Sequence, residues 1–545
     1  MERKLEREET SKVKKLSEDN VDYTFWYRYK VNELLDQLIE NKRNYKKRDR
    51  IIKKILEMEK YAAPVILERV KNAEANEASV LSQLLMLVEF EDEKIGEELI
   101  KIAFDPSISD RNKNYILKVL EYYGLEPGEL PQSQVFNDPE KAFEDARKAL
   151  FEEMIQNIES IPQFLLEVSD FPSQAQSNLV SEMVKLGDDR VVILLKIFSQ
   201  LDEPELVEEA IKGLGSIATP RSLGALEDLL NMNDRQKYYS MIKEEIYNLK
   251  EKGVLNPEGL VEDEDFQVGE LYQAAVSKID GRGNRAIWLA FRWGEERGGV
   301  CLINFLCNIN EGLKDCWGIY RVTIKEFKRI MADFRMDNSL IGNDPYYARV
   351  LLKDAINKSN ENGAKKPMEF AFWRNFLDKD WTEGEPYNPE LEKYYNIFAS
   401  SGKNVNWKEI EEVYHHRDFW DWFIHHPYVY ELASELLYAS KKHKKLVFLS
   451  TPEQAEDVYV RFVDNLIKPR FDFYYQTLRM MADFELRKGR SRVFRVIMEA
   501  LYQLDEENIE NHPLIKGIVN KSLEMAFQNL RYGYDLRISP EDFDL

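Results

Sequence analysis

Cysteine is scarce in this chain and confined to one short stretch. Only three cysteines occur among the 545 residues, Cys301, Cys307 and Cys316, separated by five and by eight residues. So few cysteines exclude a disulfide scaffold and favour a reducing compartment. The spacing also lacks the short Cys-x2–4-Cys pair of most zinc sites. In a strand, Cys301 and Cys307 would share one apolar face, so we expect buried, structural cysteines.

Long apolar runs are also missing. No stretch of about 18 apolar residues occurs, so no membrane span is expected. The first twenty residues, MERKLEREETSKVKKLSEDN, lack the apolar core of a secretory signal. Their alternating charges predict a disordered tail over residues 1–24. Together these absences predict a cytoplasmic location and no contact with a membrane.

Basic residues are outnumbered by acidic ones. The chain has 76 Lys and Arg against 98 Asp and Glu, which gives a formal net charge of −22. This balance favours solubility and argues against binding phosphate over a large surface, while it leaves room for local basic patches. Apolar residues make up 44% of the chain and aromatic residues 12%, so a wholly disordered chain is excluded.

Proline and glycine are few, at 19 and 24, and apolar positions recur every three or four residues over most of the chain. This pattern predicts a mainly α protein. Three modules can be separated after the charged tail. We expect a helical region over residues 25–250, a small β module with a helix over 268–335, and a C-terminal helical domain over 345–532.

An internal repeat lies within residues 61–250 and is clearest from 186 to 232. Two Leu-Gly pairs, Leu186-Gly187 and Leu214-Gly215, open successive units, and Asp202-Glu203-Pro204 separates two amphipathic helices. Arg190 and Arg221 occupy matching places, 31 residues apart. Repeats of about 30–45 residues are typical of helical arrays.

The order of Leu-Gly, a short turn, and then Asp or Pro followed by Arg resembles the HEAT-repeat family. The resemblance covers about a third of the chain. It implies that the helical region over residues 25–250 is an α-solenoid of stacked helical hairpins, with an extended concave surface that suits a protein ligand. It implies nothing about which ligand binds.

The β module is predicted from three segments rich in aromatic and β-branched residues, with glycine between them. They read AIWLAFRW (286–293), VCLINFLC (300–307) and CWGIYRV (316–322). We expect a three-stranded β-meander. The next stretch, Thr323–Phe334, begins with a Thr cap and has helical spacing, so it predicts a helix that covers the sheet.

Histidines cluster in the segment YHHRDFWDWFIHHP, which holds His415, His416, His425 and His426. Glu412 and His415 form a Glu-x-x-His pair, the spacing that di-iron carboxylate proteins use on a helix. Those proteins need a second such pair, and the sequence has none, so we assign no metal and no cofactor. A structural role is favoured for these histidines. Glu412, His415 and His416 are the candidates for catalysis if the protein is an enzyme.

Basic and aromatic clusters supply the candidates for binding. Basic tracts lie at Lys42–Lys54, Lys441–Lys445 and Arg487–Arg495, and Arg487, Arg490 and Arg492 are the candidates for phosphate contact. The same arginines could instead balance acidic neighbours. Trp420 and Trp422 stand in a dense aromatic run. Such a run is more often core, but Trp is also enriched where partners dock.

The sequence therefore favours a non-enzymatic interaction scaffold that binds a protein partner on the concave surface of a solenoid. A nucleic-acid or ribonucleoprotein binder acting through local basic patches is the alternative. An enzyme with a site near the His-rich segment is a second alternative. Neither the partner nor the oligomeric state can be read from the sequence.

Overall fold

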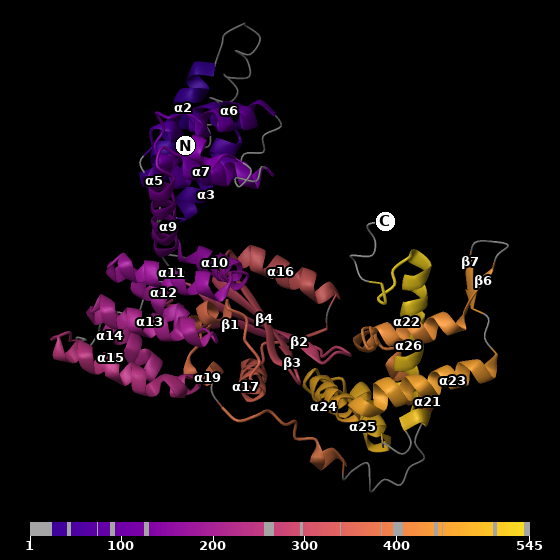
Figure 1. Cartoon of the computed structure of the whole chain (residues 1–545). Coiled ribbons are helices and arrows are strands. Elements are labelled where there is room, and N and C mark those ends of the chain that lie inside the picture. Colours follow the sequence, from indigo (N-terminus) through magenta and orange to yellow (C-terminus); the bar gives the residue numbers. More distant parts are fainter. Residues whose placement is uncertain are drawn as a thin grey trace, which may run out of the picture. The chain divides into compact units, whose positions relative to one another are not determined.

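The computed structural model describes most of the chain (Figure 1). The description leaves out residues 1–23, 41–44, 74, 88–92, 125–129, 256–265, 295–297, 338, 383, 396–406, 441–444, 449–450, 505–508 and 539–545. The predicted disordered tail therefore lies outside the described residues, except for Thr24, which begins the first described helix.

The chain is mainly helical, as predicted, and its larger sheet is antiparallel with five strands. Contacts within the chain divide it into two compact units, Met1–Ile158 and Glu159–Leu545. None of the described helices combines the length and apolar character that crossing a membrane requires.

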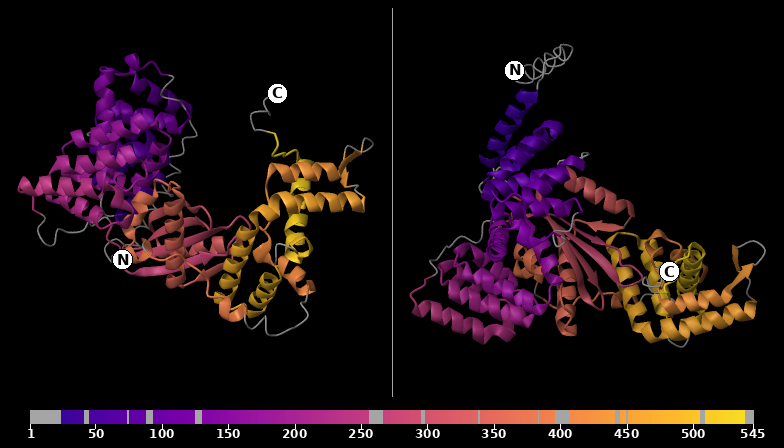
Figure 2. Two further views of the ribbon diagram at one scale, coloured as in Figure 1. Left: turned by 60° about the horizontal axis from the view of Figure 1, so that its bottom comes forward. Right: turned by 45° about the horizontal axis from the view of Figure 1, so that its top comes forward.

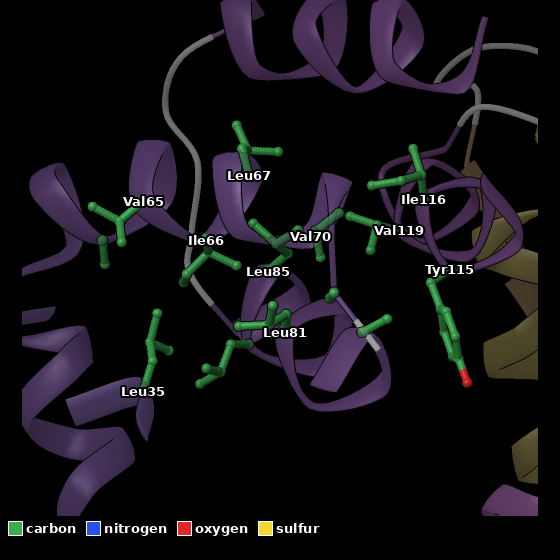
Figure 3. Packing of buried hydrophobic residues seen from close by; sticks show 14 of the residues in the cluster. Leu35, Val65, Ile66, Leu67, Val70, Leu81, Leu85, Tyr115, Ile116 and Val119 are labelled. Atoms are coloured by element: carbon green, nitrogen blue, oxygen red, sulfur yellow. The ribbon is translucent and has the colours of Figure 1, made fainter. Parts of the chain in front are cut away.

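The first unit consists of helices packed around an aliphatic core. Helix α4 packs on α3 and α5, α2 packs on α3 and α4, and α7 packs on α5, α6 and α9. Figure 3 shows the core between them, where Leu35, Ile66 and Leu81 are fully buried. The helices of this unit are α2 (Thr24–Glu40), α3 (Tyr45–Leu56), α4 (Glu59–Lys71), α5 (Ala75–Leu87), α6 (Glu93–Ala103), α7 (Asp110–Tyr122), α8 (Gln132–Val135) and α9 (Pro139–Gln156).

The second unit begins with a stack of helical hairpins (Figure 1). One layer contains α11, α13 and α15, because α13 packs on both of the others, and a second layer contains α12 and α14. The predicted helix break falls between α12 and α13, where Pro204 occupies the first turn of α13. The helices are α10 (Ile161–Ser169), α11 (Ser173–Lys185), α12 (Val192–Phe198), α13 (Pro204–Ile217), α14 (Pro220–Leu230) and α15 (Tyr239–Glu251).

The sheet follows, with strand order β4-β3-β2-β1-β5 and every pair antiparallel. The three predicted segments correspond to β2, β3 and most of β4. The prediction of three strands was wrong, because β1 and the three-residue β5 add to the sheet on the β2 side. The strands are β1 (Leu271–Ser277), β2 (Asn284–Arg292), β3 (Val300–Asn308), β4 (Gly312–Val322) and β5 (Leu340–Gly342).

Helices cover both faces of this sheet. On one face lies α16 (Ile324–Asp337), at the position of the helix predicted over Thr323–Phe334 (Figure 2). Its Phe327 and Met331 share a buried cluster with Trp288 and Leu302 of the sheet. The other face is covered by α17 (Pro345–Asn362) and α18 (Phe370–Trp373), and Phe305 of β3 meets Phe370 there. Burial on both faces explains why β3 is a nearly continuous apolar run.

The C-terminal part of the second unit consists of helices and one hairpin. Strands β6 (Leu437–Ser440) and β7 (Lys445–Phe448) pair antiparallel where only helix was expected. The helices are α19 (Lys379–Thr382), α21 (Trp407–Tyr414), α22 (Pro427–Leu436), α23 (Pro452–Phe462), α24 (Phe471–Arg487), α25 (Ser491–Gln503) and α26 (Pro513–Tyr532).

The β1–β2 turn joins the sheet to these helices. Gly281 lies so close to the segment after α21 that an added Cβ would come within 2.5 Å of the Cα of Trp422. The indole of Trp422 donates a hydrogen bond to the carbonyl of Ile279 (3.3 Å). The Gly-Arg-Gly turn at residues 281–283 thus brings the sheet and the C-terminal helices into backbone contact.

Candidate functional site

A groove of about 970 Å³ runs between α21 and α26. Its walls come from one stripe of each helix, with positions three and four residues apart, because such positions share a helix face. The end of α25 and the turn before α26 close it. The lining residues are Trp407, Lys408, Glu411, Tyr414 and His415 on one side and Gln503, Asn511, Pro513, Lys516, Gly517, Asn520, Lys521 and Glu524 on the other.

Tyr414 and Gly517 set the distance between the two helices. A Cβ at Gly517 would lie 2.6 Å from ring atoms of Tyr414, so the ring rests directly on the backbone of α26. The Tyr414 hydroxyl donates to the carbonyl of Trp422 (2.8 Å). Burial, together with the charge of Glu524, raises the pKa of Tyr414, so this hydroxyl stays protonated and acts as a fixed support.

The polar side chains of the groove have few partners within the molecule. Lys521 pairs with Glu524 (3.1 Å). In the part of the chain that the structure describes, Lys408 and Lys516 have no carboxylate within 4.0 Å. The three carboxamides, those of Gln503, Asn511 and Asn520, likewise make no hydrogen bond to described residues. These groups are therefore available to a ligand.

Trp407 gives the groove an apolar edge. This side chain is 45% exposed, and its ring lies edge-on to the buried imidazole of His512, with centroids 6.0 Å apart. Trp407 stands at the start of α21 and His512 caps α26, so the same contact fixes the mouth of the groove.

The His-rich segment is not one helix. Helix α21 ends at Tyr414, so Glu412 lies in the helix and His415 lies just past its end. A short 3-10 helix, Arg417–Phe419, follows, and His426 begins α22. The catalytic candidates therefore do not converge on one site. His415 lines the groove, whereas the ring of His416 faces the backbone of Asp418.

Three of the histidines cap helices. The Nδ1 atom of His416 accepts from the backbone N–H of Asp418 (3.3 Å), His426 from Tyr428 (3.1 Å) and His512 from Leu514 (3.3 Å). A cap of this kind requires an unprotonated Nδ1. Burial lowers the pKa of His416, and it lowers that of His512 to about 4. The structural role favoured from the sequence fits these contacts.

No group of three or more His, Cys, Asp or Glu among the described residues is placed to hold a metal ion. The three cysteines are buried in the sheet, and burial raises the pKa of the Cys307 thiol to about 12. Thiols in such an environment are not nucleophiles at neutral pH.

The two tryptophan candidates differ in exposure. Trp422 is 1% exposed and packs against the β1–β2 turn, so it belongs to the core. Trp420 is 68% exposed, and its indole donates to the carbonyl of His415 (3.3 Å). Trp420 therefore lies beside a residue that lines the groove.

The arginine candidates are all engaged in ion pairs. Arg487 contacts Asp483 (3.1 Å), and Arg492 contacts Glu409 (3.3 Å). Arg490 pairs with Asp418 and, at 3.4 Å, with Glu485. The cluster is thus neutralised by carboxylates and does not form a free phosphate-binding patch.

A buried charge cluster that no sequence pattern indicated lies between the sheet and the C-terminal helices. Asp418 and Glu485 are both fully buried, and Ser339, after α16, donates to Asp418 (3.0 Å). Lys488 contacts Ser339 as well. On the other side of Asp418, Lys278 binds Asp421 (2.6 Å) and the carbonyl of Asp418 (3.1 Å).

Two carboxyl groups at the centre of this cluster, those of Asp418 and Glu485, contact the same nitrogen of Arg490. Burial and the neighbouring Asp418 raise the pKa of Glu485 to about 8. Burial alone would raise the pKa of Asp418 too, but hydrogen bonds from Glu485 and Ser339 and the charge of Arg490 lower it. Glu485 therefore holds the proton and Asp418 the charge. Both residues stand near predicted candidates, Asp418 near His416 and Glu485 near Arg487, but no sequence pattern links one to the other.

The other basic tracts are described only in part. Residues 42–44 and 441–444 lie outside the described residues, and the remainder of the first tract forms α3. Arg48 of that helix donates to the side chain of Gln83 (3.1 Å).

Comparison with known proteins adds little. No protein-family model matches the chain, and no curated protein matches it. Among solved structures, human deoxyhypusine hydroxylase in complex with glycerol is similar over 41% of this chain and 98% of its own, with 14% sequence identity and a TM-score of 0.15. A TM-score of 0.15 is too low to support a conclusion about fold or function.

Proposed function

We propose that this protein is a non-enzymatic interaction scaffold that binds a protein partner, and that α10–α15 form a HEAT-like solenoid segment. The observation that supports this best is the packing of every second helix. Helix α13 packs on α11 and α15, and α12 packs on α14, so two parallel layers build up one hairpin at a time. Arrays of this kind present extended surfaces to macromolecular ligands.

The segment that follows α17 contacts this stack near the end of α12. Gln200 contacts Asn375 (3.2 Å), and Asp202 accepts from the backbone of Lys366 (2.8 Å). The layer formed by α11, α13 and α15 has exposed side chains that make no such contact, among them Tyr247, which is 64% exposed. An exposed aromatic side chain of this kind is suited to a protein partner.

The two alternatives have less support. Nucleic-acid binding through the C-terminal arginines would have to displace Asp483, Glu485 and Glu409 from them. Catalysis by Glu412, His415 and His416 would need them to converge, whereas His415 and His416 face different neighbours.

A site-specific crosslinking experiment tests the scaffold. A photoreactive phenylalanine analogue replaces Tyr247 in one layer and Asp228 in the other, and the full chain is irradiated in cell extract. We expect one dominant protein to crosslink from one layer at physiological salt, and untagged full chain to compete for it. If neither position captures a protein and the purified chain turns over a substrate, the proposal is wrong.

A further inference from the structure

The groove between α21 and α26 differs from the other charged clusters of the second unit. In the arginine cluster Arg487, Arg490 and Arg492 are each paired with a carboxylate, and beside Asp418 so is Lys278. In the groove, Lys408 and Lys516 have no carboxylate partner among the described residues, and three carboxamides are free beside them. A set of unpaired polar groups converging on one concavity is typical of a ligand site.

The dimensions of the groove match an extended peptide. Its wall on α26 runs from Pro513 to Glu524, which at about 1.5 Å per residue is about 16 Å. An extended chain advances about 3.3 Å per residue, so about five residues fit along it. The ring of Tyr414 rests on the backbone of Gly517, and this contact keeps α21 and α26 at a fixed separation.

The carboxamides suit a peptide backbone. Each of Gln503, Asn511 and Asn520 offers one acceptor oxygen and two N–H donors, which can pair with the N–H and C=O groups of a peptide unit. Such contacts do not depend on the side chains of the ligand. Trp407 at the mouth provides an aromatic surface for one apolar side chain.

The charge of the groove selects among peptides. Three lysines face two glutamates, and one of those glutamates, Glu524, is already paired with Lys521. Among the described residues, Lys408 and Lys516 are the cations of the lining without an ion-pair partner, and Glu411 is the anion without one. The described lining therefore carries a net positive charge, in a chain whose formal net charge is −22.

We propose that this groove binds an extended, acidic segment of a protein partner, held by its backbone to the carboxamides and by its carboxylates to Lys408 and Lys516. The inference rests on the proposed scaffold function, and it adds a second contact, distant in sequence from the helical stack, together with the chemistry of the segment that binds there.

Peptide binding to the full chain tests this. An array of short peptides, each with one leucine or phenylalanine, spans net charges from strongly acidic to strongly basic. Three variants are compared with the wild type: Lys408→Glu with Lys516→Glu, Asn520→Leu, and the control Lys325→Glu with Lys328→Glu. The control makes the same change in net charge at exposed positions of α16, outside the groove and outside the helical stack.

We expect acidic peptides to bind the wild type best. The groove double variant should weaken them by about tenfold, since two attractions become repulsions, and the control by less than about twofold. Asn520→Leu should weaken all bound peptides to a similar extent, whatever their charge. Circular dichroism and thermal melting check that each variant folds.

Three results would overturn the proposal: no peptide binds, basic peptides bind as well as acidic ones, or the groove variant and the control behave alike. Displacement of the peptides by a single-stranded oligonucleotide would also overturn it, in favour of a nucleic-acid ligand. Crosslinking from Tyr247 or Asp228 does not use the groove. A chain that crosslinks a partner from the stack but binds no peptide therefore contradicts this inference alone.

Discussion

Charged residues that look alike in the sequence of the C-terminal helices contribute very differently to the stability of the protein. Arg490 and Arg492 are two positions apart in one basic tract. The carboxylates that Arg490 meets, Asp418 and Glu485, are fully buried, whereas the Arg492 side chain is 76% exposed. A charge left alone in the interior is costly, while an exposed pair contributes little.

Replacing these two arginines separately should therefore give unequal results. We expect Arg490→Ala to lower the free energy of unfolding by about 3 kcal/mol, because it leaves the Asp418 carboxylate without its nearest cation. Arg492→Ala should change it by less than about 1 kcal/mol. Urea denaturation at neutral pH measures both. Equal losses would mean that the cluster around Asp418 is not the stabilising feature described above.

His512 is a residue whose role depends on its charge. Its Nδ1 caps α26 by accepting from Leu514, so its Nε2 carries the proton and donates to the carbonyl of Ala500 (3.1 Å). A second proton would have to go on Nδ1, where it would meet the Leu514 N–H. The folded protein therefore resists protonation, and burial lowers the pKa of His512 from 6.5 to about 4.

This predicts a loss of stability in acid. Between pH 6.5 and about 4, His512 binds a proton in the unfolded chain but not in the folded protein. The free energy of unfolding therefore falls as the pH falls, by up to about 3 kcal/mol from this residue. His512→Asn keeps an N-cap acceptor but does not titrate. Its loss of stability over the same interval should be smaller than that of the wild type. Parallel curves from urea denaturation across this pH range would contradict the assignment.

At this scale the sequence indicates residue types and not their partners. It showed that His415, Arg490 and Trp420 belong to chemically rich clusters. It could not show that Arg490 also meets Asp418, which is 72 residues away in the chain, or that Ser339 and Lys278 complete the cluster from the region of the sheet. The groove was missed for the same reason, since its two walls are about a hundred residues apart in the chain.

At the scale of elements, local pattern was a good guide where it was strong. The apolar runs of β2 and β3 and the helical spacing of α16 were recognised because each is dictated by its own burial. Strand β1, LYQAAVS, has two alanines at its centre, and β5 has only three residues. These two strands are defined by pairing with a neighbour rather than by their own composition.

Gly517 offers a test of how closely α21 and α26 approach. Alanine at this position would favour the helix by about 1 kcal/mol, but its Cβ would lie 2.6 Å from the ring of Tyr414. We expect Gly517→Ala to destabilise the protein by about 1–2 kcal/mol overall, because the closely packed helices must move apart. Urea denaturation measures the change.

Gly96 in α6 provides the matched control, because nothing lies within 4 Å of a Cβ added there. Gly96→Ala should raise stability by about 0.5–1 kcal/mol, through helix propensity alone. If Gly517→Ala were stabilising to the same degree, the ring of Tyr414 would not rest on α26 as described.

At the scale of the whole molecule, the chain is built from two compact units, and the boundary along the sequence falls between Ile158 and Glu159. Each has its own aliphatic or aromatic core, with Leu35 and Ile66 in the first and Phe305 and Trp422 in the second. The sequence placed residues 25–250 in one helical region, because helices with similar periodicity look continuous along a chain. Periodicity reports which face of a helix is buried, and it does not report which neighbours bury it.

Two units with separate cores should unfold separately, and the substitutions above can show it. We expect fragments 1–158 and 159–545 each to give helical circular dichroism and a cooperative melting transition. In the full chain, Gly96→Ala should raise only the transition of the first fragment, and Arg490→Ala should lower only that of the second. Calorimetry of the full chain and of both fragments measures this. A single transition that responds to both substitutions would show that the cores are coupled, because energy lost in one unit would then destabilise the other.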